Sequence, residues 1–256
     1  MHKLLLLLLI PFAALANPID DQCPQHVLRG APISPQAPGT TQYLCKTNYA
    51  IHYRYDTKTA EYVAQRITVE NISGPAKRKD DFRPDPAIPK QHQSQLSDYA
   101  GFPFDRGHLS PGADNTQNAV VMSESFFLSN MVPQVPNHNR GIWKQLETFV
   151  RKWVAEGKDI YVISGTVYAQ GYQTIGVNRV GIPTHMWKVV VDRKGSKSIA
   201  FLFPNAPLPV QDLPKFATSI DEIERVTGIN FMPQLTKAQE AKLERGINLA
   251  DWSGLQ

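Results

Sequence analysis

A histidine and an arginine stand two residues apart in segment 104–111, which reads FDRGHLSP. Histidine can take a proton from water near neutral pH, since its unperturbed pKa is about 6.5. Arg106 is permanently charged and can hold phosphate oxygens through two parallel hydrogen bonds. Gly107 lets the backbone bend between them. The pattern predicts that His108 and Arg106 take part in phosphate chemistry; a packed histidine without a chemical role is the alternative.

Further polar residues follow along the chain. Segment 129–134 reads SNMVPQ, segment 137–147 reads NHNRGIWKQLE, and Arg151 lies just beyond. Apolar residues recur through the second segment at helical spacing, which predicts a helix over 140–156. Gly157 is expected to end it.

The predicted helix places three polar side chains near one groove. At about 100° per residue, Glu147 and Arg151 lie roughly 80° and 120° around the helix from Asn139. Arg151 would be roughly 18 Å along the axis from Asn139, too far to share a ligand unless its long side chain reaches back. A solvated ion pair between Glu147 and Arg151, four residues apart, is the alternative and would contribute only about 0.3–0.5 kcal/mol.

Together these segments resemble the DNA/RNA non-specific endonucleases of the ββα-metal superfamily. The resemblance rests on the Asp-Arg-Gly-His run and the asparagine-containing helix, and it covers roughly residues 49–233. It implies an α+β, mixed α/β fold, in which an antiparallel sheet core carries a ββα-metal motif with one magnesium site. It also implies an endonuclease that hydrolyses phosphodiester bonds of DNA and RNA without sequence specificity and leaves 5′-phosphate ends.

The resemblance implies a role for each motif residue. His108 is the general base for water, oriented by a backbone carbonyl that we expect near Asn130. Asn139 is the single protein ligand of Mg²⁺, with Mn²⁺ as a substitute. Magnesium suits such a site because it keeps most of its waters and takes few protein oxygens. The alternative for Asn139 is a helix N-cap, and the two roles are compatible.

The remaining charged residues are assigned in the same way. The family pattern gives Glu147 to a metal-bound water and Arg151 to the phosphate. It also places a phosphate-binding arginine upstream, for which Arg78 and Arg83 are both candidates; for either, a solvated charge run is the alternative. We expect Asp105 to shape its loop rather than to bind metal.

The first sixteen residues predict a signal peptide. Lys3 precedes an apolar run over 4–10, and the small residues Ala14 and Ala16 form an Ala-x-Ala pattern that fits cleavage after Ala16. The run is shorter than the roughly 20 residues of a membrane span. We therefore expect no membrane span in the mature chain and a secreted or periplasmic protein.

Cys23 and Cys45 are the only cysteines. An exported chain with an even count most economically joins them in a disulfide, worth roughly 3 kcal/mol in the chain-entropy model. They lack the spacing of zinc ligands. Five prolines between residues 17 and 41 predict an extended Pro-rich arm, 17–46, that the core need not contain.

Residues 47–256 are expected to form a single nuclease domain, because a chain of this length builds one sizeable core more easily than two. Alternating apolar residues predict a hairpin over 49–55 and 61–69. Antiparallel hairpins with separate helices argue against a doubly wound sheet. Further strands are predicted at 159–165, 186–191 and 198–203, and short helices at 219–227 and 237–245.

The formal net charge of +4 favours polyanions as partners, and the resemblance names DNA and RNA as substrates. The sequence identifies no inhibitor protein. Two other functions remain open: a non-catalytic exported nucleic-acid-binding protein, and a phosphodiesterase restricted to one substrate. The joint presence of His108, Asn139 and Glu147 weighs against the first, because binding alone needs only cations and stacking surfaces.

Overall fold

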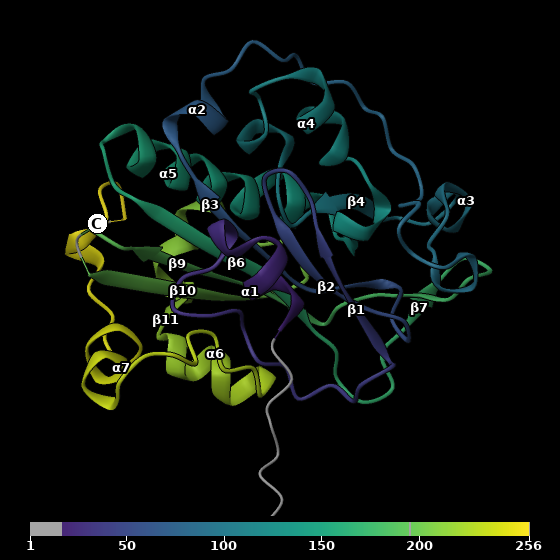
Figure 1. The fold of residues 1–256 in the computed structure, drawn as a ribbon. Coiled ribbons are helices and arrows are strands. Elements are labelled where there is room, and N and C mark those ends of the chain that lie inside the picture. Colours follow the sequence, from purple (N-terminus) through teal and green to yellow (C-terminus); the bar gives the residue numbers. More distant parts are fainter. Residues whose placement is uncertain (1–16, 195, 256) are drawn as a thin grey trace, which may run out of the picture.

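A seven-stranded antiparallel sheet forms the centre of the protein (Figure 1). The computed structural model describes residues 17–194 and 196–255, so the predicted signal peptide, 1–16, lies outside the described residues. The strand order is β1-β2-β3-β6-β9-β10-β11. In that order the strands span Thr41–Cys45, Ala50–Arg54, Thr59–Ile67, Ile160–Val167, His185–Asp192, Lys197–Pro204 and Ala217–Thr218.

The structure confirms the predicted hairpin and the three later strands. β2 and β3 pair with Ile51 opposite Val63, and β6, β9 and β10 continue the sheet in antiparallel register. β3 and β9 are buried along nearly their whole length, so they do not alternate between core and solvent. Both faces of the sheet are covered, and each has its own apolar core.

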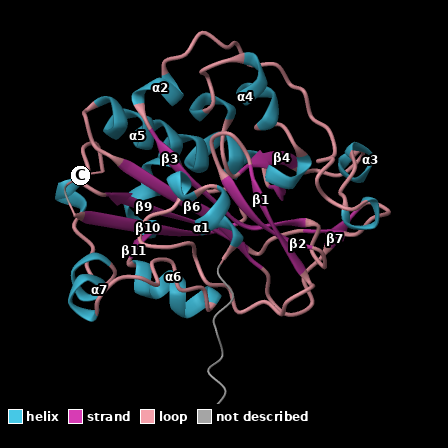
Figure 2. Ribbon diagram, in the orientation of Figure 1, coloured by secondary structure: helices cyan, strands magenta, loops and turns pink. Residues whose placement is uncertain are grey.

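Helices lie on both faces of the sheet (Figures 1 and 2). α5 packs on one face, and Figure 1 shows α2 and α4 beside it; α1 and α6 pack on the other. The helices predicted at 219–227 and 237–245 are confirmed as α6 and α7. The bounds from α1 to α7 are Pro18–Gln22, Val69–Ile72, Leu96–Tyr99, Ala119–Glu124, Lys144–Ala155, Ile220–Thr227 and Lys237–Leu243.

Residues 17–46 are not the extended arm that their prolines predicted. They form α1, a 3-10 turn and β1, and Ile19 and Cys23 are buried in the core on the second face of the sheet. Pro18 and Pro24 stand at the first positions of the two short helices, where the missing N–H costs nothing. The segment therefore belongs to the same sheet-centred core as the residues after it.

A two-stranded ribbon and a helix carry the motif residues. β4 (Asp105–His108) pairs antiparallel with β5 (Met131–Gln134). The chain then forms a π-helical turn, η5 (His138–Trp143), before α5. The helix predicted over 140–156 is thus in two parts, because Gly141 has non-helical backbone angles (φ −102°, ψ −109°).

Gly107 is required for space rather than for bending. A Cβ atom at this position would lie 1.9 Å from the Oε1 atom of Gln134, so only glycine fits beneath that side chain. The φ angle of Gly107 is outside the left-handed region. The expected bend at Gly107 is therefore wrong: it lies within a regular strand that a neighbouring side chain crosses closely.

Shorter elements complete the described chain. A small hairpin joins β7 (Thr174–Ile175) to β8 (Val180–Gly181). No helix within 17–194 or 196–255 has the length and apolar character needed to cross a membrane. The 3-10 turns lie at Pro24–His26, Lys90–His92, Gly112–Asp114, Leu128–Asn130, Val210–Phe216 and Leu249–Asp251.

The predicted disulfide between Cys23 and Cys45 is present and joins the end of α1 to the end of β1. Replacing both cysteines by serine should lower the free energy of unfolding by roughly 3 kcal/mol, because the unfolded chain gains the entropy of an open loop of 22 residues. Guanidinium unfolding without reductant measures this. A reducing agent should destabilise the wild type but not the double variant; equal midpoints for the two unreduced proteins would contradict the prediction.

Candidate active site

One cavity of about 530 Å³ collects most of the residues that the sequence singled out. It is lined by residues of the β4 strand, the η5–α5 segment and the loops before β4 and after it. Two predicted residues, Arg83 and Asn130, do not line it. The six that do are Arg78, Arg106, His108, Asn139, Glu147 and Arg151.

The structure distinguishes the two upstream arginines. Arg78 lines the cavity and pairs there with the exposed Asp80, Nε to Oδ1 at 2.7 Å. Arg83 is directed elsewhere: its NH1 group donates to Asp81 at 2.9 Å and to the backbone carbonyl of Ser123 at 3.0 Å. Arg78 is therefore the candidate for a phosphate contact, and Arg83 braces the loop on which both stand.

His108 is buried at the cavity wall, with the rings of Phe82 and Phe126 5.7 and 4.9 Å from its own. Its Nε2 atom is enclosed and has no hydrogen-bond partner within the described part of the chain. Burial lowers the pKa of His108 to about 3, and the charges of Arg78 and Arg106 contribute to the shift. The imidazole is therefore neutral at pH 7 and has a lone pair to accept a proton.

Asn130 lies behind the cavity. It is fully buried, and its side chain bonds the backbone N–H and C=O of Ser110 at 2.9 and 2.8 Å. Its own carbonyl accepts from the Leu109 N–H at 3.1 Å and forms no hydrogen bond with the ring of His108, contrary to expectation. Asn130 thus fixes the turn after His108, while the indole N–H of Trp143 donates to the His108 carbonyl at 3.2 Å.

Arg106 faces the cavity and has no salt-bridge partner among the described residues. Its guanidinium carbon lies 4.3 Å from the centroid of the Phe82 ring, a cation–π distance. Its Nε atom is buried without a hydrogen-bond partner in the described chain. The aromatic ring holds the cation in place without neutralising it, so the guanidinium remains available for an anion.

Asn139 is held by Asp105 rather than acting as a helix cap. Its Nδ2 group donates to Asp105 at 2.8 Å, and Arg140 donates to the same carboxylate at 2.8 and 2.6 Å. Burial opposes ionisation of Asp105, but these hydrogen bonds outweigh it and hold its pKa below the usual value. Because a carboxylate only accepts, the amide nitrogen faces Asp105 and the amide oxygen is left for another partner.

The ion pair considered between Glu147 and Arg151 is not formed. Arg151 instead donates from NH1 to Asp114 at 2.9 Å. Asp114 is buried and also accepts from Gln65 at 3.3 Å. The contact with Asp114, which is not on α5, orients the long side chain of Arg151. Arg151 therefore lines the same cavity as Asn139.

Lys188, in the middle of β9, is buried below this group of charges. It is 2% exposed, its Nζ atom donates to Ser164 at 2.6 Å, and it lies 4.4 Å from the centroid of the Trp143 ring. Burial raises the pKa of Glu147 to about 7, and the charge of Lys188 opposes that shift. Burial likewise lowers the pKa of Lys188 to about 8, opposed by Glu147 and Asp114.

Sequence reasoning missed several of these partners. The sequence did contain an indication of Lys188, because a lysine inside the otherwise apolar strand segment MWKVVV is unusual. Asp114 left none, since it is 37 residues from Arg151. Lys144 also lines the cavity; it stands on the motif helix three residues before Glu147, but it was given no role. Phe82 lines the cavity too, and no spacing connects it with the motif.

Comparison with known proteins agrees with this geometry. A sequence profile described as DNA/RNA non-specific endonuclease matches residues 31–238. The chain belongs to the DNA/RNA non-specific endonuclease family. The mixed α/β fold with a ββα-metal motif, predicted from the sequence, is confirmed.

Individual relatives extend the comparison. The chain is 35% identical to the mitochondrial nuclease EXOG of Danio rerio over 214 residues, covering 77% of this chain but 62% of that protein. It is 31% identical to a nuclease of Nostoc sp. over 256 residues, covering 93% and 92%. A solved complex of EndoG with its inhibitor EndoGI superposes with a TM-score of 0.73 at 26% identity, covering 79% of this chain and 90% of that one. The chain thus spans about three fifths of the length of the EXOG relative.

Replacing Lys188 by methionine should move the pH profile of nuclease activity. The positive charge of Lys188 favours the ionised form of Glu147, so its loss raises a pKa that is already about 7. Activity that needs ionised Glu147 should then fall at pH 7 and recover at higher pH. Cleavage rates measured from pH 6 to 9 test this, with Lys152→Met on the exposed side of α5 as the control. An acid limb at the same pH in both variants would contradict the prediction.

Proposed function

We propose that this protein is an exported, magnesium-dependent endonuclease that hydrolyses phosphodiester bonds of DNA and RNA without sequence specificity. The observation that supports it most is the convergence of a neutral buried histidine, three arginines and an oriented asparagine oxygen on one cavity. Family membership supports the same reaction class. His108 acts as the base, and Arg78, Arg106 and Arg151 face the phosphate.

His108 takes the proton of the attacking water. With a pKa of about 3 it is a weak base in the free protein, and two of the causes are the charges of Arg78 and Arg106. A phosphate bound between these arginines offsets both charges, so the histidine becomes more basic when substrate is present. Base and substrate are therefore coupled through the same two cations.

The arginines differ in how they are held, and this suits different tasks. Arg106 is uncompensated by any salt bridge in the described chain, so its full charge is directed at the anion. Arg151 is held by the buried Asp114, so less side-chain freedom is lost when it contacts the phosphate. Stabilising charge that develops on a pentavalent phosphorus requires such fixed cations in a site with little water.

A magnesium ion fits the residues that are present. The amide oxygen of Asn139 is left without a partner by the Asp105 contact, and Glu147 supplies a nearby carboxylate in the same cavity. Oxygen donors of this kind, few in number, are those that Mg²⁺ or Mn²⁺ takes while it keeps several waters. When bound, the ion would stabilise negative charge on the phosphate and the leaving oxygen.

Cleavage without sequence specificity is expected from the chemistry of the residues that line the cavity. Its charged members are five cations and three carboxylates, all suited to phosphate, water or metal. Its aromatic members, Phe82 and Phe104, could contact bases only by stacking, which distinguishes bases poorly. Export is supported by the Cys23–Cys45 disulfide and by the signal-peptide pattern of residues 1–16.

Replacing Asp105 by alanine should raise the magnesium concentration needed for half-maximal activity by about 10–100-fold, because the amide of Asn139 would lose its orienting partner. The control is Asp212→Ala, which removes an ion pair with Lys215 elsewhere on the surface. Activity measured against magnesium concentration decides. An unchanged half-saturation point in Asp105→Ala would show that Asn139 is not a metal ligand.

Replacing His108 by alanine should slow cleavage of both plasmid DNA and RNA by about 10²–10⁴-fold and leave binding largely intact. The same substrates with wild-type protein in magnesium and in EDTA test the whole proposal. Cleavage of both, lost with EDTA, supports the endonuclease. Intact nucleic acid with a gel shift would select the binding protein, and cleavage of only one polymer would select the restricted phosphodiesterase.

A further inference from the structure

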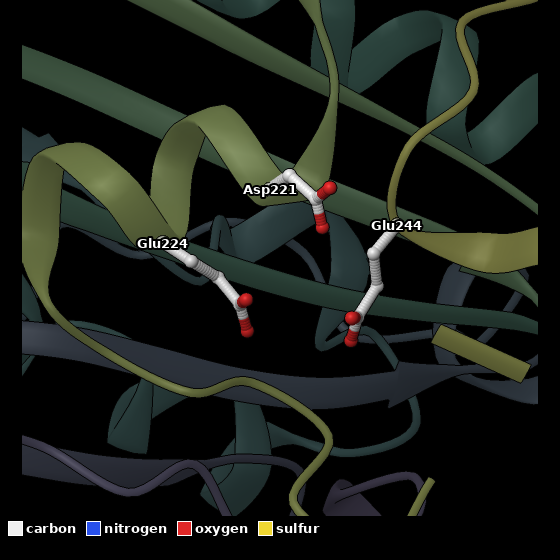
Figure 3. Close-up of side chains that lie close together, drawn as sticks. All are labelled: Asp221, Glu224 and Glu244. Atoms are coloured by element: carbon white, nitrogen blue, oxygen red, sulfur yellow. The ribbon is translucent and has the colours of Figure 1, made fainter. Parts of the chain in front are cut away.

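Three carboxylates meet on the side of the sheet away from α5 (Figures 1 and 3). Asp221 and Glu224 stand on α6, three residues apart, and Glu244 follows the end of α7. One oxygen of each lies within 4.8 Å of the others, and Figure 3 shows the side chains directed toward a common space. None of the three lines the active-site cavity.

Glu244 is the member of this cluster that lacks a partner. It is 4% exposed, and its carboxylate forms no hydrogen bond or salt bridge with any residue of 17–194 or 196–255. Buried carboxylates are normally paired, because leaving one unpaired in a place with little water is costly. Burial and the neighbouring charges of Glu224, Glu240 and Asp221 together raise the pKa of Glu244 to about 7. A buried acceptor facing only other carboxylates indicates a positively charged ligand.

The other two carboxylates are only partly satisfied. Glu224 accepts from the backbone N–H of Phe231 at 2.8 Å through Oε1, which leaves its second oxygen free for another contact. Asp221 has the exposed Arg245 at 3.6 Å, a separation longer than a normal hydrogen bond. Each of the three residues therefore has at least one oxygen available for the common space.

We propose that Asp221, Glu224 and Glu244 bind a calcium ion that holds α6 to the C-terminal segment. The donors are oxygens alone, which suit a hard cation and not zinc. Oxygens that coordinate one Ca²⁺ at about 2.3–2.6 Å can lie up to roughly 5 Å apart, so three oxygens within 4.8 Å of one another can share one ion. Three protein carboxylates also suit Ca²⁺ better than Mg²⁺, which keeps several waters and is usually bound by one or two carboxylates.

The location gives the ion a structural role. The backbone N–H of Asp221 already donates to the carbonyl of Glu244 at 3.0 Å, so the start of α6 and the end of α7 touch. Repulsion among the three carboxylates opposes the contact between α6 and the end of α7. A divalent cation bound between the carboxylates would turn that repulsion into attraction. Calcium should therefore stabilise the fold without taking part in catalysis.

A proton shared within the cluster is the competing explanation, and it predicts a different response to calcium. Both explanations allow Glu244→Gln to stabilise the calcium-free protein by removing repulsion. Only a calcium site predicts that the protein with all three carboxylates intact becomes more stable as the calcium concentration rises.

The experiment measures thermal unfolding of the full mature chain that carries Asn139→Ala, so that the proposed catalytic metal ligand is absent. At about 10 mM calcium chloride its Tm should rise by about 3–10 °C, the size expected for a site with a Kd of about 10⁻⁴–10⁻³ M. Adding Glu244→Gln should abolish the rise. Glu222 on α6 pairs with Arg225 and is not part of the cluster. Adding Glu222→Gln removes one negative charge, as Glu244→Gln does, but should preserve the rise in Tm.

Two results would overturn the proposal: no rise in Tm of the Asn139→Ala protein, or an equal rise after Glu244→Gln is added. Circular dichroism first establishes that Glu244→Gln is folded. If it is not, Asp221→Asn takes its place with the same expectation. Calorimetric titration with calcium chloride gives a second readout, one site per chain in the Asn139→Ala protein that disappears with either cluster variant.

Discussion

The packing of α5 across the central sheet is the contact on which the site depends. Leu146, Val150 and Trp153 bury one stripe of the helix in the core against the sheet. The edge of the helix that this leaves accessible carries Glu147 and Arg151 to the cavity. At the start of the helix, Trp143 bonds the His108 carbonyl, so the strand with the base and the helix with the charged groups are fixed to each other. The non-helical Gly141 separates α5 from the turn that carries Asn139.

Burial sets the protonation states in this region more than any single charge pair does. It is the largest cause of the lowered pKa of His108 and of the raised pKa values of Asp114 and Glu147. Neighbouring positive charges offset part of the rise in the two carboxylate pKa values: Arg151 favours ionised Asp114, and Lys188 favours ionised Glu147. The result is a neutral base beside permanently charged arginines, with the Glu147 carboxylate, at a pKa of about 7, close to titration, an arrangement suited to an anionic substrate.

Much of the fold could be predicted because its signals are local. Alternating apolar residues predicted the β2–β3 hairpin, and runs of β-branched and aromatic residues predicted the later strands. The helical spacing of apolar residues predicted α5, and Gly157, with φ of +92°, ends that helix as expected. Predictions failed where a contact distant in sequence decided the outcome. Residues 17–46 are Pro-rich yet belong to the core because Ile19 and Cys23 pack into it and β1 pairs with β2. Gly107 is needed because Gln134 crosses it.

The sequence by itself determined the family, the residue types and five of the eight non-cysteine residues predicted for the site, since the spacing of these five within two short segments is what makes them recognisable. Only the tertiary structure decided which upstream arginine faces the cavity, that Asn130 braces a turn, and that Asp114 holds Arg151. It alone brought Glu244 to Asp221 and Glu224. The physical reason is that periodicity and turn chemistry act over a few residues, whereas ion pairs and buried polar contacts are fixed by how whole elements pack.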